Sequence, residues 1–147
     1  MMDALRPLPM LRSAALQVAA VALAAPVVAM LWAAQTPPRG SAPAWDALLA
    51  LLLIAPVAEE IVFRAGLQDW LQRRAWAGSP RVRTALAIGL SSLVFALCHA
   101  LAHGSWPALA VVVPSLALGL VYQACGLGVA IGCHAWFNLC FVLAARG

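Results

Sequence analysis

The chain carries two adjacent carboxylates and one guanidinium within a stretch of hydrocarbon side chains. Glu59, Glu60 and Arg64 follow residues 47–57, which are almost entirely apolar. Charged groups in a segment that could cross a bilayer are unfavourable unless they are paired or face a cavity, and they therefore mark candidate functional sites. A carboxylate in such a place can act as a general base toward water.

The spacing of these three residues predicts different roles for them on a helix. Glu60 and Arg64 are four residues apart, so they share one face, and the acidic residue comes first, which is the favourable order for an ion pair. Glu59 points in another direction and is left without a partner on its own helix. We therefore predict a Glu60–Arg64 pair and Glu59 as the general base. The alternative is that the pair is only a packing clamp between helices.

Two further pairs with the same helical spacing supply imidazole groups. His134 and Asn138 are four residues apart, so the amide can orient the ring or contact the same substrate. Phe95 and His99 have the same spacing, and the phenyl ring can wall a cavity beside the imidazole. Glu59, His99 and His134 would together activate a water molecule and stabilise a developing oxyanion. For each histidine alone, the alternative is a hydrogen bond between helices.

The same three residues raise the question of a metal ion. Glu59, His99 and His134 could ligate zinc and leave the fourth position to water. However, the sequence has no HExxH motif, and its four cysteines form no CxxC pair, so no zinc knuckle or disulfide framework is indicated. We therefore favour a site without a metal or other cofactor, with zinc as the alternative.

The composition places these residues in a membrane protein. Of 147 residues, 65% are hydrophobic and only 10% are charged, whereas about a quarter of the residues of soluble domains are charged. The mean hydropathy is +0.94. The net charge of +4 comes from arginine alone and is spread over loops and termini. This distribution favours contact with anionic lipid and argues against nucleic acid as a partner.

The chain is expected to be one integral membrane domain, residues 1–147, with an all-α fold of about five spans. The first span is interpreted as a retained helix, because its apolar run is longer than that of a signal peptide. Short connections between the helices predict antiparallel neighbours in a bundle. The site would lie between the second, third and fifth helices. The expected helices are 13–34, 46–74, 84–103, 108–124 and 127–145.

Arginine placement predicts the orientation in the membrane. The positive-inside rule places the arginine-rich side in the cytoplasm, and this side includes the N-terminus. It holds Arg6 and Arg12 before the first helix and Arg73, Arg74, Arg81 and Arg83 between the second and third, against Arg39 and Arg146 on the opposite side.

Three functions are compatible with polar groups at these positions. A membrane-embedded hydrolase would use Glu59 to activate water. A proton-relay or small-solute carrier would also place ionisable groups within the membrane, although the chain has no repeated half of the kind common in transporters. A non-catalytic binder of the immunity type would hold a peptide in the same cavity, without needing an activated water.

The three motifs, in this order on successive hydrophobic helices, resemble the CPBP family. This family comprises CAAX-prenyl-protease and bacteriocin-processing (Abi) intramembrane endopeptidases. The resemblance covers residues 45–143 and leaves out the helix at 13–34. Where the family often has glycine directly after the motif's arginine, this chain has Ala65-Gly66. The motifs are Glu59-Glu60-x-x-x-Arg64, Phe95-x-x-x-His99 and His134-x-x-x-Asn138.

This resemblance implies a protease that cleaves membrane-associated proteins in the bacterial inner membrane. It makes Glu59 the base that activates water and lets His99 and His134 assist or hold the oxyanion. Glu60, Arg64, Phe95 and Asn138 would support the site. Within the family, the chain resembles short bacterial members of the JDVT-CTERM type, which are proposed to process proteins with C-terminal sorting tags. A lipidated CAAX protein is another substrate that the family allows.

Overall fold

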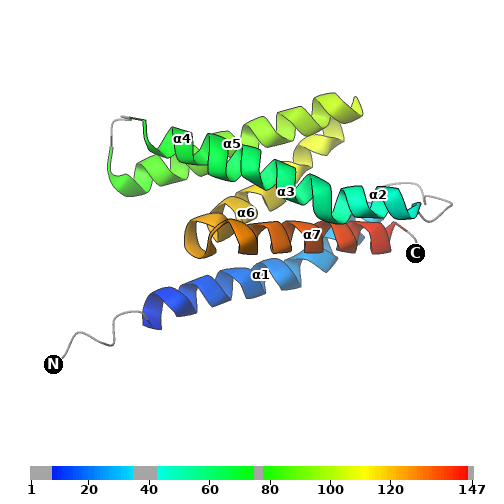
Figure 1. The fold of residues 1–147 in the computed structure, drawn as a ribbon, viewed down its shortest axis with the longest axis horizontal. Helices are drawn as coiled ribbons and strands as arrows, with labels where there is room; N and C mark the ends of the chain where they lie inside the picture. Colours follow the sequence, from blue (N-terminus) through cyan, green and yellow to red (C-terminus); the bar gives the residue numbers. More distant parts are fainter. Residues whose placement is uncertain (1–7, 35–42, 75–77, 146–147) are drawn as a thin grey trace.

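The computed structural model describes residues 8–34, 43–74 and 78–145, and these residues form helices and short connections without any strand. The helices are shown in Figure 1. A helical stretch from residue 45 to residue 72 consists of α2 (Trp45–Leu49), η1 (Ala50–Ile54), α3 (Ala55–Glu60), η2 (Ile61–Gln68) and α4 (Asp69–Gln72). The others are α1 (Leu8–Ala33), α5 (Pro80–His103), η3 (Trp106–Val111), α6 (Val112–Cys125) and α7 (Leu127–Ala144).

Four of these helical segments are long and apolar enough to cross a membrane: 13–33, 80–103, 106–125 and 127–144. The predicted all-α polytopic bundle is therefore confirmed for the described residues. The expected second span does not meet the same criterion. Its helical stretch is present at 45–72, but every 18-residue window in it contains more than two charged residues, because Glu59, Glu60 and Arg64 lie near its middle.

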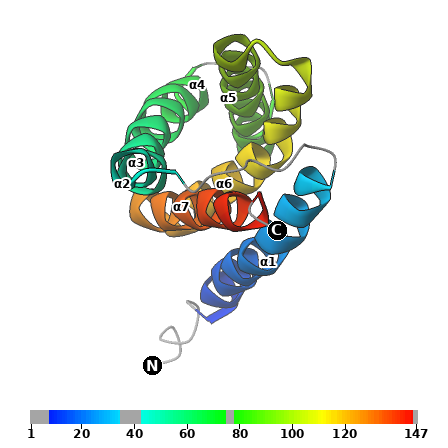
Figure 2. The same cartoon turned by 90° about the vertical axis from the view of Figure 1, so that its right-hand side faces the viewer.

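The stretch 45–72 is the element on which the rest of the site is built. Seen end-on in Figure 2, this stretch is arranged in a ring with α5, α6 and α7, while α1 lies outside the ring against α6 and α7. It packs against α5 through η2 and α4, and against α7 through η1, α3 and η2. Among the described residues, α5 and α7 have no Cα atoms within 8 Å of each other. Groups on these two helices therefore reach the stretch from different sides.

The core lies between α1, α6 and α7 and is made largely of small side chains. Ala25 and Ala29 of α1 and Ala130 of α7 are fully buried. Small residues let membrane helices approach closely, which favours packing where apolar burial gives no advantage over lipid. Trp136 of α7 also donates a hydrogen bond from its indole nitrogen to the carbonyl oxygen of Ala22 in α1, at 3.1 Å.

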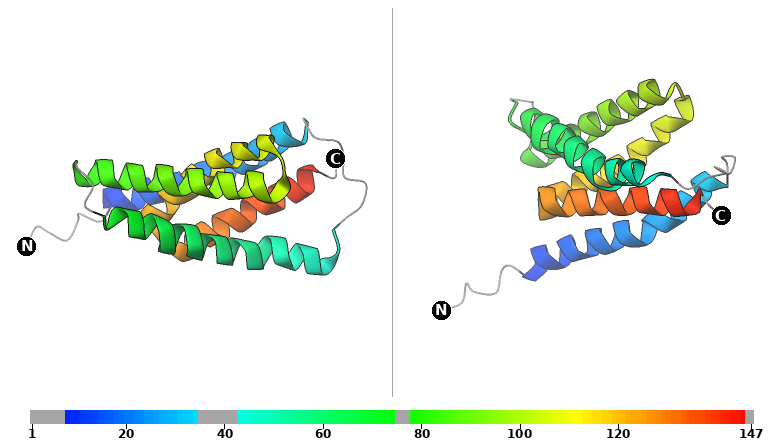
Figure 3. Two further views of the ribbon diagram at one scale, coloured as in Figure 1. Left: turned by 90° about the horizontal axis from the view of Figure 1, so that it is seen from above. Right: turned by 45° about the vertical axis from the view of Figure 1, so that its right-hand side comes forward.

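The helices alternate in direction between the two ends of the bundle. In Figure 3 the beginning of α1, the end of α4 and the beginning of α5 lie at one end. The end of α1, the beginning of α2 and the end of α7 lie at the other. Arg6, Arg39 and Arg146 are outside the described residues.

Three predicted helix starts were wrong. The first helix begins at Leu8 and not at residue 13, and the other two differences have a local reason. The third helix begins at Pro80, four residues earlier than expected, because the hydroxyl of Ser79 accepts the N–H of Val82 at 3.4 Å and caps it. Proline suits the first helical position because it has no N–H to leave unpaired. The fourth helix begins as the 3₁₀ turns of η3, and Pro114 then falls in the first turn of α6, where it is tolerated.

A close approach between helices at Gly119 gives a prediction on stability. A Cβ atom there would lie 2.8 Å from the Cγ2 atom of Ile88 and 3.1 Å from the Oε1 atom of Gln68. We expect Gly119→Ala to lower the free energy of unfolding by about 1–3 kcal/mol, as overpacked cores do. Thermal unfolding in detergent would measure this. In Gly132→Ala, where a Cβ meets nothing within 4 Å, stability should be unchanged or higher; equal losses in both variants would contradict the packing argument.

Candidate active site

The two carboxylates lie on a short α-helical segment between two wider turns. Glu59 and Glu60 end α3, which η1 precedes and η2 follows. Single π-helical turns inside α-helices occur often at functional sites, since they rotate the following residues relative to a regular helix. The structure thus places the sequence motif where the direction of side chains departs from that of an ideal helix.

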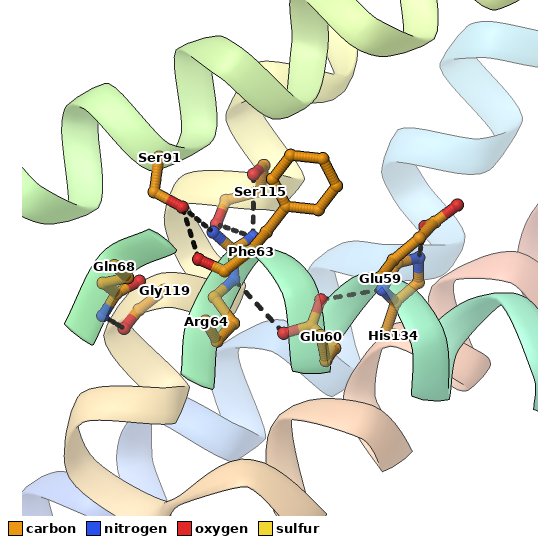
Figure 4. A network of polar contacts seen from close by, with 9 residues as sticks. All are labelled: Glu59, Glu60, Phe63, Arg64, Gln68, Ser91, Ser115, Gly119 and His134. Atoms are coloured by element: carbon orange, nitrogen blue, oxygen red, sulfur yellow. Dashed lines mark hydrogen bonds and ion pairs between the residues drawn. The ribbon is translucent and has the colours of Figure 1, made fainter. Parts of the chain in front are cut away.

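The predicted ion pair is present and completely buried. The Nε atom of Arg64 lies 3.2 Å from the Oε2 atom of Glu60, and both side chains are 0% exposed. Figure 4 shows the pair at the centre of a network of polar contacts. Neither group can reach solvent, and the two are joined by a charge-assisted hydrogen bond, which is stronger than a neutral one.

Arg64 also joins the stretch 45–72 to two other helices. Its guanidinium donates to the hydroxyl of Ser91 in α5 at 3.4 Å, and to the carbonyl and hydroxyl oxygens of Ser115 in α6 at 3.0 and 2.8 Å. The Ser91 hydroxyl in turn donates to the carbonyl of Phe63 at 2.6 Å. The sequence analysis missed both serines. Ser91 could have been found because it lies four residues before Phe95, on the helix face that carries the aromatic ring and the imidazole.

His134 lies between the two carboxylates and contacts both. Its Nδ1 atom is 2.8 Å from the Oε1 atom of Glu60, and its Nε2 atom is 3.4 Å from the Oε2 atom of Glu59. Glu59 was expected to have no partner on its own helix, and the partner that it has comes from α7. Asn138 does not contact this ring in the structure, because its amide donates instead to the carbonyl of Leu51 at 2.8 Å.

The contacts orient the imidazole ring of His134. A carboxylate oxygen accepts, so the Nδ1 atom of the ring is the donor in the contact with Glu60. The Nε2 atom then faces Glu59 at 3.4 Å. A histidine whose second nitrogen is held by a carboxylate is well oriented for proton transfer.

Exposure distinguishes the two carboxylates. Glu60 is fully buried, and His134 is only 5% exposed, whereas 28% of the Glu59 side chain is accessible. Glu59 is therefore the carboxylate that a water molecule or a substrate can reach. Glu60 serves to hold the imidazole and the guanidinium.

His99 reaches this site through Phe95. The ring of Phe95 lies 4.3 Å from that of His99 and 6.0 Å from that of His134, measured between centroids. The Nδ1 atom of His99 is 3.2 Å from the carbonyl oxygen of Phe95; since a carbonyl only accepts, Nδ1 is the donor and Nε2 is left for other partners. The predicted ring beside an imidazole is thus present, and the ring touches both histidines.

Zinc was the alternative to a site without a metal, with Glu59, His99 and His134 as its ligands. Among the residues that the structure describes, no three His, Cys, Asp or Glu side chains are grouped so that they could hold a metal ion. Both nitrogens of His134 face carboxylates.

These features define a class: a polytopic α-helical membrane protein with a buried carboxylate–imidazole–guanidinium network and one accessible carboxylate. A family model described as type II CAAX prenyl endopeptidase, Rce1-like, matches residues 41–140. The chain belongs to this family, as the CPBP motifs predicted, and is a CAAX-type intramembrane protease that acts on peptide substrates. No curated protein and no solved structure was found to match the chain.

Proposed function

We propose that the protein hydrolyses peptide bonds with a water molecule activated by Glu59, without a metal ion. The observation that carries this proposal is the contact of the accessible Glu59 carboxylate with His134, whose other nitrogen is held by the buried Glu60. The Glu59 carboxylate is thus an accessible proton acceptor, and the imidazole of His134 contacts it from the buried side of the site. Such a pair can take up and return a proton within one reaction cycle.

In the proposed reaction, Glu59 removes one proton from water, and the water oxygen attacks the carbonyl carbon of the scissile bond. The carbonyl electrons move to its oxygen, which becomes an oxyanion. The carbon–nitrogen bond then breaks, and Glu59 returns the proton to the leaving nitrogen. The imidazole of His99 assists at the developing oxyanion, a contribution that is large where water is excluded. His134, whose two nitrogens face Glu60 and Glu59, orients the base.

The substrate proposed for this reaction is a membrane protein whose cleaved segment lies near the ends of its own membrane-spanning helices. A C-terminal sorting tag and a lipidated CAAX tail are both included in this class. The protein would act in the bacterial inner membrane with its N-terminus in the cytoplasm, as the arginine distribution favours. A panel of tagged tails and a prenylated CAAX peptide would distinguish these substrates.

Purified protein in detergent should cleave at least one of these tails in the presence of a strong chelator. The expected result follows from the arrangement of Glu59, His99 and His134, which do not surround a common ion position. Product formation would be followed by mass spectrometry with and without chelator. Loss of cleavage in chelator, restored by added zinc, would overturn the metal-free mechanism. Absence of cleavage for every tail, together with proton flux in liposomes, would overturn the proteolytic function itself.

A further inference from the structure

A groove lies between α5 and α6 at the end of the bundle where α5 begins. The two helices approach closely at Ile88 and Gly119, where a Cβ atom on the glycine would lie 2.8 Å from the isoleucine. From this crossing they diverge toward the beginning of α5 and the end of α6 (Figure 1). The space between them has a volume of about 380 Å³, and its lining includes Arg81, Thr84, Ala85, Ile88, Leu120 and Gln123. The groove is therefore a wedge that narrows toward the crossing.

The lining of the groove changes from polar to apolar along its length. Arg81 and Gln123 lie at the wide end, and Thr84 lies one helical turn further in, whereas Ile88 and Leu120 form the narrow part. Leu120 is 50% exposed, and both helices belong to segments that are long and apolar enough to cross a membrane. The groove thus borders on lipid and fits a molecule with a polar group at one end and hydrocarbon at the other.

The polar end of the groove carries a guanidinium without an acidic partner. Residues 69–83 hold four arginines and one aspartate, and this Asp69 lies 3.6 Å from Arg73 and accepts the hydroxyl of Tyr122. In the part of the chain that the structure describes, no ion pair involves Arg81. A guanidinium presents a fork of donors that matches the geometry of a phosphate. A phosphate with a net negative charge therefore complements this end of the groove.

We propose that the groove binds an anionic phospholipid from the leaflet at the arginine-rich end of the bundle. The phosphate accepts from Arg81 and from the amide nitrogen of Gln123, whose oxygen is occupied by the amide of Gln72. One acyl chain follows the groove from Arg81 to Ile88, a distance of two helical turns or about 10 Å. A zwitterionic lipid has the same phosphate, but only an anionic one also balances the surrounding arginines. This binding does not depend on the reaction proposed for Glu59.

Thermal unfolding in a nonionic detergent, with phosphatidylglycerol titrated in, tests the proposal. A ligand that binds the folded state raises the unfolding midpoint, and we expect phosphatidylglycerol to raise it more than phosphatidylcholine does. Arg81→Ala should weaken the apparent affinity for phosphatidylglycerol about tenfold, the value of one hydrogen bond to a charged group. Arg83→Ala is the matched control, because it removes the same charge from α5 outside the lining of the groove. At about 0.15 M salt it should cost about twofold, since exposed charges are screened.

Ala85→Phe tests the acyl chain without changing any charge. Ala85 is exposed and lines the groove, so a phenyl ring there would occupy the space for hydrocarbon. We expect the affinity for phosphatidylglycerol to fall about tenfold, the value of about two displaced methylene groups. Glycerol phosphate, which has no acyl chain, should leave the midpoint of the wild type unchanged.

Three results would overturn the lipid site. Phosphatidylcholine could raise the midpoint as much as phosphatidylglycerol, which would show that charge plays no part. Arg81→Ala and Arg83→Ala could weaken binding equally, which would show a diffuse basic surface in place of a groove. Glycerol phosphate could act as strongly as the lipid, which would show a site for a free phosphate group.

Discussion

Glu59→Gln is expected to abolish cleavage while leaving the fold in place. The amide keeps the size and one oxygen of the carboxylate but cannot take a proton from water, and general base catalysis contributes about 10²–10⁴-fold to a rate. Because 28% of the Glu59 side chain is accessible and its partner is a single imidazole nitrogen, the substitution leaves the Glu60–Arg64 pair intact. We expect kcat/KM for the cleaved tail to fall by about that factor at an unchanged midpoint of thermal unfolding.

The matched control is Asp46→Asn, which neutralises a carboxylate at the beginning of the same helical stretch. The Asp46 side chain accepts only the N–H of the next residue, Ala47, at 2.9 Å. Its loss should leave cleavage close to that of the wild type. Full activity in Glu59→Gln would contradict the proposed role of this carboxylate. Loss of activity in both variants would show that cleavage depends on the negative charge of the helical stretch and not on proton transfer by Glu59.

Arg64→Ala is expected to be the most destabilising single substitution in the chain. The side chain is 0% exposed and holds Glu60, Ser91 and Ser115 together. Removing one partner of a buried ion pair leaves an uncompensated charge, which costs about 3–5 kcal/mol. The midpoint of thermal unfolding in detergent and the yield of monodisperse protein should both fall, and cleavage should be lost with them.

Arg64→Lys keeps the prediction testable if the alanine variant does not fold. Lysine retains the charge, but its single nitrogen cannot reproduce the fork of donors that reaches three residues at once. We expect an intermediate loss of stability. Arg73→Ala is the surface control: this arginine is 79% exposed and lies 3.6 Å from Asp69, and such pairs contribute less than about 1 kcal/mol. Equal midpoints for Arg64→Ala and Arg73→Ala would contradict the central role of the buried pair.

The sequence by itself determined the class of fold and one half of the site. Long apolar segments with short connections satisfy their backbone hydrogen bonds in a membrane only as helices, because lipid offers no partners to unpaired N–H and C=O groups. The Glu60–Arg64 pair followed from spacing on a single helix, where neighbours four residues apart meet regardless of the rest of the fold. For the same reason the ring of Phe95 could be placed beside His99.

The other half of the site was decided by the packing between helices. Whether Glu59 has a partner depends on the height of α7 against α3, which no spacing within one helix can show. The serines that hold Arg64 come from α5 and α6, and the sequence does not distinguish Ser91 from its neighbour Ser92 on the same helix. Asn138 was expected to orient His134 or to contact the same substrate, and in the structure its amide donates to the carbonyl of Leu51 on another helix. Contacts between helices depend on their rotation and depth, and only the tertiary structure specifies these.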